Sequence, residues 1–186
     1  MLINALRAFL LLLAVTALAG CQFVGDNRGN VPLPKALVER LAAIGSSPAE
    51  PMMIRVYKES SELEVWKRTR SGRYALLKTY PICKWSGTLG PKIKQGDYQS
   101  PEGFYDVTPA LLNPQSSYHL SFNTGFPNKF DQAHARTGTY LMIHGDCLSV
   151  GCYAMTDDGI KEIYALARET FRGGNAAFQL QLLPSA

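Results

Sequence analysis

Apolar and polar residues alternate through much of the chain, which is the pattern of half-buried β-strands. The expected strands are 52–57, 63–66, 74–80, 118–122, 139–144 and 178–183, and 97–107 is expected to form a strand, a turn and a strand. The third strand is expected to end at Pro81. A glycine-rich segment, 86–96, and a polar segment, 126–138, are expected to be loops.

Two segments instead place apolar residues at helical spacing. Residues 35–44 form a short candidate helix, which Pro48 and the serines before it follow. Residues 156–170 form a stronger one, with Thr156 as its N-cap and two acidic residues in the first turn, where the helix dipole favours negative charge. The whole pattern predicts a mainly β fold with one or two helices.

The amino end has the layout of a secretion signal. Arg7 precedes an apolar run, 8–18, which is too short to span a bilayer comfortably. The tetrapeptide 18–21 (LAGC) resembles the bacterial lipobox, in which the signal is cut before a cysteine that is then lipidated. We therefore expect a lipoprotein signal peptide at 1–20 and a lipid anchor on Cys21. An ordinary signal peptide whose cleavage site lies near a cysteine is the alternative.

The expected location follows from this signal. The protein is expected to be exported, periplasmic and lipid-anchored. Gln22 stands where an aspartate would favour retention in the inner membrane, and by resemblance to enteric lipoproteins this favours the outer membrane. Residues 21–50 are expected to comprise the lipidated cysteine and a linker, and 51–186 to form one catalytic domain.

Composition fits one globular domain and argues against a nucleic-acid partner. Hydrophobic residues make up 46% of the 186 residues and charged residues 18%. The formal net charge is +4, and removing Arg7 with the signal lowers it by one. Such a mild charge, without a basic stripe, does not indicate nucleic-acid binding.

Four cysteines are present, and export would place them in an oxidising compartment. With Cys21 lipidated and Cys152 acting as a nucleophile, Cys83 and Cys147 remain for a disulfide. Two alternatives stay open. Cys83 and Cys147 are both free and buried, or Cys147 and Cys152 form a bridge that inactivates the enzyme.

Candidate chemistry lies between residues 140 and 155. An expected strand ends at His144, and a turn-rich segment then leads to Cys152, which follows Gly151. A neighbouring histidine activates a thiol for attack on a carbonyl, and this predicts a thiolate with a lowered pKa. The carbonyl of Gly145 is an available acceptor for the second imidazole nitrogen, and backbone N–H groups around Cys152 are candidate oxyanion donors.

Other interpretations of these residues are weaker. His144, Cys147 and Cys152, with Asp146 as a fourth candidate, have the composition of a metal site, but the spacing is not that of a zinc finger. A buried structural role for the cysteine and the histidine is the other alternative. No metal or cofactor is expected.

The same residues carry a family resemblance. The segments 143–145 (IHG) and 149–152 (SVGC) resemble the catalytic motif of YkuD-type L,D-transpeptidases, and 100–106 (SPEGFYD) resembles an upstream segment of that family. More closely, 54–182 is similar to the YafK-like branch of exported murein L,D-transpeptidase homologues, chiefly at 81–92, 127–128 and 151–155.

The resemblance implies a YkuD-like L,D-transpeptidase β-sandwich and a thioester intermediate with a peptidoglycan stem peptide. By position, Cys152 is the nucleophile and His144 the base. Ser149, Gly151 and Tyr153 are expected on the substrate side of the site.

The chain departs from that family in two ways. Ala154 stands where members commonly have arginine or asparagine, and only eight positions separate the histidine from the cysteine. These departures leave open a hydrolase (amidase) that releases peptidoglycan-attached lipoprotein from meso-diaminopimelate. A non-catalytic lipoprotein that tethers the membrane to peptidoglycan is a further alternative, and a general thiol protease has the least support.

A second histidine precedes the expected strand at 139–144. His134 lies 18 positions before Cys152, nearer the usual family spacing, and is the rival base. We expect instead that His134 and Arg136 bind substrate carboxylates, since arginine binds them with two parallel hydrogen bonds. An ordinary solvated loop is the alternative.

Overall fold

The structure is a computed structural model that describes residues 26–186. The signal peptide expected at 1–20 and the lipidation expected at Cys21 lie outside the described residues. Within residues 26–186, no helix is both long and apolar enough to cross a bilayer.

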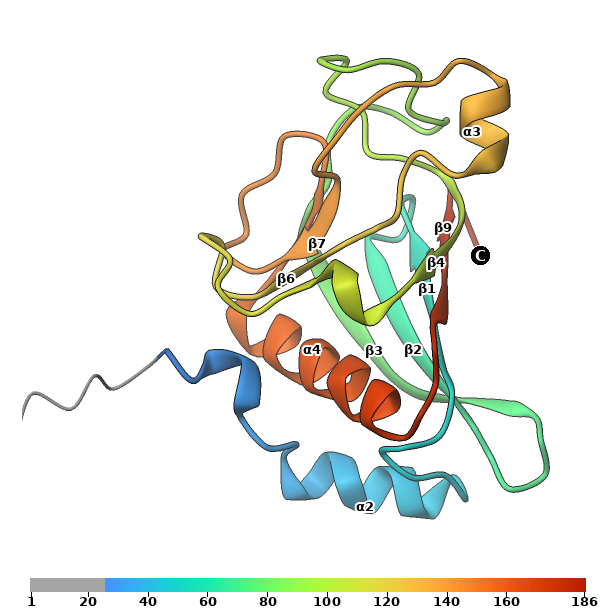
Figure 1. The fold of residues 1–186 in the computed structure, drawn as a ribbon, viewed down its shortest axis with the longest axis vertical. Helices are drawn as coiled ribbons and strands as arrows, with labels where there is room; N and C mark the ends of the chain where they lie inside the picture. The colour runs from blue at the N-terminus through green and yellow to red at the C-terminus, as the bar shows by residue number, and fades with distance from the viewer. Residues whose placement is uncertain (1–25) are drawn as a thin grey trace, which may run out of the picture.

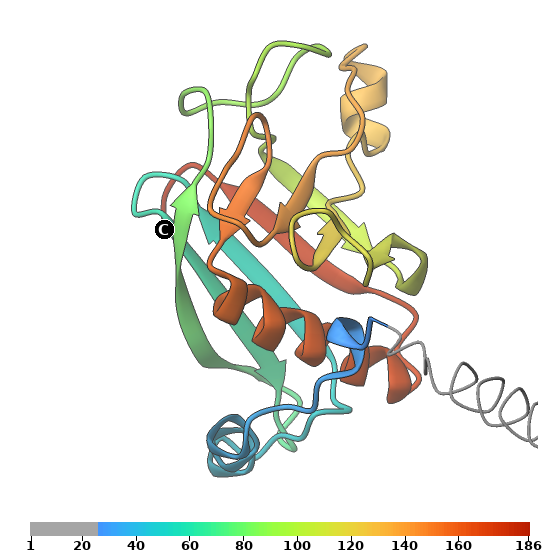
Figure 2. The same ribbon diagram turned by 90° about the vertical axis from the view of Figure 1, so that its left-hand side faces the viewer.

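One nine-stranded sheet forms the body of the protein, and it curls around a helix (Figures 1 and 2). Its strands run in the order β4-β9-β1-β2-β3-β8-β7-β6-β5. Their bounds are β1 Met52–Tyr57, β2 Glu62–Arg68, β3 Tyr74–Lys84, β4 Gly103–Val107, β5 Leu112–Asn113, β6 Ser121–Asn123, β7 Met142–His144, β8 Tyr153–Met155 and β9 Phe178–Leu183. The expected mainly β fold is confirmed.

The two halves of the sheet join through β3. Most of this strand pairs with β2, while its last residues pair with β8. The predicted end of the strand at Pro81 is therefore wrong. Pro81 still faces β2, and the strand changes partner directly after it, where a missing N–H is tolerated. This continuation carries Cys83 and Lys84 to the region of β7 and β8.

The longest helix, α4 (Asp157–Arg172), lies against the sheet in Figure 2. Thr156 caps it as predicted, because its hydroxyl accepts the N–H of Gly159 at 3.0 Å. Its buried face includes Ile160, Ile163 and Tyr164 and joins the main hydrophobic core. The helix thus begins immediately after β8 and fixes the position of that strand.

The segment expected to be a linker is partly folded. It contains a 3-10 helix, η1 (Arg28–Asn30), and the expected helix, α2 (Lys35–Ala43). Leu37 and Leu41 of α2 belong to the core, so the packed domain begins well before the predicted boundary at residue 51. The apolar face of this short helix needs such a partner, because helices of this length are marginal alone.

Short elements in the predicted loops and strands were missed. The polar loop contains α3 (Lys129–Ala133), whose N-cap Asn128 forms a reciprocal capping box with Asp131. A second 3-10 helix, η2, spans Pro109–Leu111. The strand predicted from residue 97 is absent, because the Asp97 carboxylate accepts the N–H groups of Ile93, Lys94 and Gln99 and closes a loop instead.

Candidate active site

Parallel pairing of β7 with β8 brings His144 close to Cys152. Ile143 pairs with Tyr153 and His144 with Ala154. Side chains alternate between the two faces of a strand, so Cys152 lies on the same face as His144. The backbone N–H of Met142 donates to the Cys152 sulfur at 3.3 Å, which fixes the thiol beside β7.

Cys152 and His144 line one pocket of about 610 Å³. Its remaining walls are mainly apolar, and the pocket lies over the ends of the two strands. The other lining residues are Met142, Tyr118, Tyr140, Leu148, Val150, Ser149 and Lys84. A pocket that holds a candidate nucleophile and a titratable base is the candidate active site.

The imidazole of His144 is oriented by its own turn. Its Nδ1 lies 2.5 Å from the carbonyl oxygen of Gly145, so Nδ1 carries the hydrogen and Nε2 has the basic lone pair. The ring of Tyr118 packs on the imidazole with centroids 4.7 Å apart. Burial lowers the pKa of His144, and the Gly145 hydrogen bond partly opposes this. The side chain is thereby held neutral.

Position 145 leaves little room for a side chain. A Cβ there would lie 2.6 Å from the Asp157 carboxylate and 3.0 Å from the carbonyl of Tyr118. The same Gly145 donates its N–H to that Tyr118 carbonyl at 3.0 Å. Gly145, expected as a catalytic residue, thus supplies the carbonyl that orients the histidine.

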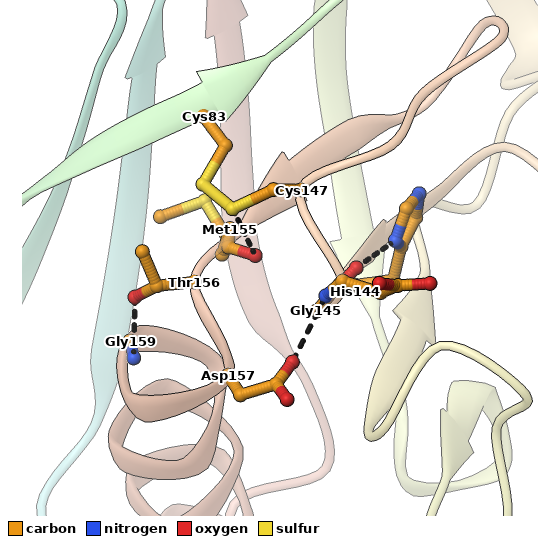
Figure 3. Close-up of a disulfide and its surroundings, with 9 residues drawn as sticks. Cys83, His144, Gly145, Cys147, Met155, Thr156, Asp157 and Gly159 are labelled. Atoms are coloured by element: carbon orange, nitrogen blue, oxygen red, sulfur yellow. Dashed lines mark hydrogen bonds between the residues drawn. A yellow bond between two sulfur atoms is a disulfide. The ribbon is translucent and has the colours of Figure 1, made fainter.

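The turn after Gly145 is held from two sides, as Figure 3 shows. Asp157, at the start of α4, accepts the N–H of Asp146 at 2.9 Å. Cys147 is bonded to Cys83 of β3 with an S–S distance of 2.04 Å. Both Asp146 and Cys147 have positive φ, which few non-glycine residues adopt without support. The disulfide therefore anchors the segment between His144 and Cys152.

This pairing corresponds to the first of the cysteine arrangements considered from sequence. Cys152 is a free thiol, and within residues 26–186 no cluster of histidine, cysteine, aspartate and glutamate could hold a metal ion. Since Cys147 is in the disulfide, it is not available as a metal ligand beside His144.

Hydroxyl groups fix the backbone on either side of the thiol. Ser149 and Ser100 both donate to the carbonyl of Cys152, at 2.6 and 2.9 Å. The Gly151 N–H donates to the Ser86 hydroxyl at 2.5 Å and is therefore not a candidate oxyanion donor. Gly151 has a φ of +100°, a region that favours glycine.

Sequence reasoning assigned no role to Ser86 or Ser100. Ser100 lies in the 100–106 segment already noted, and Ser86 opens the glycine-rich loop. The available signal was therefore the family resemblance of these segments, since nothing in their local pattern reveals a contact with the Cys152 region.

The thiol itself is half-buried and protonated. Burial raises the pKa of Cys152, while the Met142 N–H and the charge of Lys92 oppose this rise. In this state the thiol lies 3.5 Å from the carbonyl of Tyr140, to which it donates. The direction of this shift is opposite to the lowered thiol pKa expected from sequence. A neutral thiol beside a neutral imidazole suits general-base activation instead.

These two shifts set an expected pH dependence. Labelling of Cys152 by iodoacetamide should be slow near about pH 6 and should keep rising beyond the usual thiol range. The acid limb of kcat/KM should have its midpoint below about 6.5, because His144 must lose its proton to act as base and burial lowers its pKa. Stopped labelling reactions measure the reactivity of Cys152, and pH–rate profiles measure the acid limb of kcat/KM. A labelling rate that is already maximal near about pH 5 would reveal a preformed thiolate and contradict this picture.

Tyr153 does not face the substrate side. Its side chain is fully buried, and its hydroxyl donates to the carbonyl of Pro101 at 2.7 Å. As the residue after Cys152 on β8, it points to the opposite face of the sheet. The prediction for Tyr153 is therefore corrected to a core residue that holds the 100–106 segment.

His134 and Arg136 also lie away from the pocket. Arg136 pairs with the buried carboxylate of Asp131 at 2.9 Å, and the His134 ring packs on Phe130 with centroids 4.2 Å apart. Nδ1 of His134 lies 2.9 Å from the carbonyl of Phe130. Neither residue lines the pocket with Cys152. The guanidinium predicted to bind substrate thus holds α3 in place.

Comparison with known proteins places this fold and site in context. No protein-family model matches the chain. The chain is 42% identical over 180 residues to a protein of Escherichia coli strain K12 provisionally named L,D-transpeptidase YafK. The alignment covers 97% of this chain and 70% of the relative.

Two solved structures share the fold. The helical cell shape determining protein Pgp2 of Campylobacter jejuni superposes with a TM-score of 0.57 at 20% identity over 81% of this chain. Bd1075 of Bdellovibrio bacteriovorus gives 0.51 at 24% identity over 76% of this chain. The chain spans 56% of Pgp2 and 51% of Bd1075. At these identities the likeness concerns the fold alone. The identity and coverage of the match to YafK show that the chain belongs to the YafK-like L,D-transpeptidase family.

Proposed function

We propose that this protein is an exported cysteine enzyme that acts on peptidoglycan stem peptides through a thioester acyl-enzyme. Membership of the L,D-transpeptidase family supports the reaction class. The observation that carries the residue assignment is the shared pocket of Cys152 and His144, with His144 Nδ1 committed to Gly145. That geometry leaves Nε2 as the basic nitrogen for the thiol.

Acylation proceeds by attack of the Cys152 sulfur on a peptide carbonyl. The thiol turns from the Tyr140 carbonyl toward His144, and Nε2 takes its proton as the new C–S bond forms. The C–N bond of the tetrahedral intermediate then breaks, and the imidazolium gives the proton to the departing amine. The product of this half-reaction is a thioester on Cys152 and a free amine.

Deacylation returns the enzyme to its starting state. An incoming amine or a water molecule attacks the thioester while Nε2 of His144 accepts its proton. The C–S bond breaks, and the sulfur recovers a proton from the imidazolium. An amine acceptor gives a transpeptidase product and water gives a hydrolase product. Acylation is common to both, so the acceptor is decided by product analysis.

Fixed backbone around the nucleophile supports this scheme. Ser100 and Ser149 hold the Cys152 carbonyl, and the Cys83–Cys147 disulfide with Asp157 holds the turn after His144. Catalysis gains when reacting groups are already placed, because little ordering then remains for the transition state. The four contacts come from two loops, from β3 and from the start of α4.

Export and anchoring are part of the proposal. Cleavage after Gly20 and lipidation of Cys21 would tether the folded domain, which includes α2 as well as residues 51–186, to the periplasmic face of a membrane, most simply the outer membrane. Several acyl chains, at about 0.8 kcal/mol per buried methylene, make a durable anchor. Mass spectrometry of the protein isolated from membranes tests this, and an unmodified Cys21 would refute the anchor.

Purified sacculi that carry bound lipoprotein provide the functional test. We expect full-length protein to change the muropeptide profile, and Cys152→Ala to lose at least about 10³-fold of that rate, as for loss of a covalent nucleophile. New crosslinks between stem peptides identify a transpeptidase. Released lipoprotein or shortened stems without new crosslinks identify a hydrolase. An equal change with Cys152→Ala would contradict the proposed nucleophile, and no change with either protein would leave a tethering role.

A further inference from the structure

The catalytic pocket contains one fixed charge. Among its lining residues, Lys84 is the only lysine, arginine, aspartate or glutamate. The other walls are apolar or carry hydroxyl groups, besides His144 and Cys152. No carboxylate in the lining balances the ammonium. The charge of this hollow, when the histidine is neutral, is therefore positive.

Lys84 differs from the lysines buried nearby. Lys58 pairs with Glu102 at 3.0 Å and donates to three carbonyls, and Lys92 pairs with Asp97. The side chain of Lys84 is exposed, and within residues 26–186 it makes no ion pair or side-chain hydrogen bond. Lys58 and Lys92 stabilise the loop that begins at Ser86, whereas Lys84 has no such structural partner.

Sheet register places Lys84 on the same face of the sheet as Cys152, and both residues line the pocket. Lys84, the last residue of β3, pairs with Ala154 of β8. Paired residues point to the same face, and Cys152, which directly precedes β8, lies two positions before Ala154 and on that face. Directly opposed side chains have Cβ atoms about 5 Å apart, and two residues along a strand add roughly 7 Å. A flexible four-carbon stem spans much of that separation.

A bound peptide would change the surroundings of Lys84. The exposed apolar side chains of Tyr140, Leu148 and Val150 line the same hollow, so a ligand that fills it displaces water from the ammonium. Removing water from an unpaired cation costs free energy, and pairing the cation with a carboxylate offsets that cost. The pocket thus favours ligands that bring an anion to this point.

We propose that Lys84 binds a free carboxylate of the acyl-donor peptide, carried within about one residue of the carbonyl that Cys152 attacks. This inference rests on the proposed function only in naming the ligand as an acyl donor. It assigns to Lys84 the carboxylate recognition that the sequence had suggested for His134 and Arg136. On this proposal, the charge of the donor peptide, rather than its length, decides which donors bind at this side of the pocket.

Alkylation of Cys152 tests the position of the charge without any turnover. Iodoacetate is an anion and iodoacetamide is its neutral analogue, so their rate ratio reports a cation near the thiol. We expect Lys84→Gln to lower the iodoacetate-to-iodoacetamide ratio about 5-fold, the size of a screened interaction between unit charges at close range. Lys35→Gln removes an exposed lysine from α2 and should leave the ratio unchanged. Full-length Cys152→Ala gives the background from Cys21.

Turnover of paired donors tests the ligand. Two stem peptides that differ only in a carboxylate or a carboxamide beside the scissile bond are compared. We expect Lys84→Gln to raise KM for the carboxylate peptide about 10- to 100-fold and to leave KM for the carboxamide peptide within about 2-fold of wild type. Lys84→Arg should recover most of the lost affinity for the carboxylate peptide. An unchanged alkylation ratio and an unchanged carboxylate preference in Lys84→Gln would overturn the proposal. If the ratio falls but the wild-type protein turns over neither peptide, the proposed function fails while the placement of the charge stands.

Discussion

Replacing His144 with alanine is expected to lower turnover of stem peptides by at least about 10³-fold while the protein stays folded. The Cys152 thiol is protonated in its half-buried position, so without the imidazole nothing in the pocket takes its proton. The loss should appear in kcat, because the interaction is made as the C–S bond forms. Initial rates with purified variants, together with thermal melts, measure the effect.

His134→Ala is the matched control for this experiment. It removes the other histidine considered as a base, and that side chain lies at the C-terminal end of α3, outside the pocket that contains Cys152. Its activity should stay within about 2-fold of wild type, as for a surface change away from the site. The opposite result, with His134→Ala inactive and His144→Ala active, would overturn the assignment of the base.

Loss of the Cys83–Cys147 disulfide is expected to have the largest effect on stability. The bridge closes 64 residues of chain, and a double variant with alanine at both positions should lower the free energy of unfolding by about 2–4 kcal/mol. Activity should also fall, because the turn between His144 and Cys152 loses its covalent tie to β3. Denaturant unfolding followed by circular dichroism measures the first effect and initial rates measure the second.

A reduced wild-type sample provides the control for the disulfide prediction. Reduction should reproduce the loss of stability of the double variant, whereas Cys152→Ala should retain the stability of the oxidised protein. Equal stability of the oxidised wild type and the double variant would show that the bridge does not restrain the fold. Full activity in the double variant would show that Asp157 alone suffices to hold the turn.

Local sequence patterns predicted the elements that bury one continuous face. β1, β9 and α4 appear where alternation or helical spacing placed them, because each has one continuous buried face. The short elements α3 and β8 were missed. Five helical residues and three strand residues carry too little periodicity, and they are stabilised by partners distant in sequence.

The candidate pair, Cys152 and His144, could be proposed from sequence because both residues come from one segment joined by a turn. The contacts that hold them could not. Ser100 reaches the Cys152 carbonyl across 52 positions, and Lys84 joins the pocket only because β3 continues past Pro81 to pair with β8. Tyr153 was misassigned because proximity in sequence to the nucleophile ignores the alternation of side chains along a strand.

Direct observation of the acyl-enzyme is the sharpest test of the central claim. Full-length protein would be mixed with a synthetic stem peptide, quenched in acid during turnover and digested for mass spectrometry. We predict an added mass equal to the acyl part of the donor on the peptide that contains Cys152, removable by hydroxylamine as expected for a thioester. Turnover without this adduct, or an adduct on another residue, would contradict catalysis through Cys152.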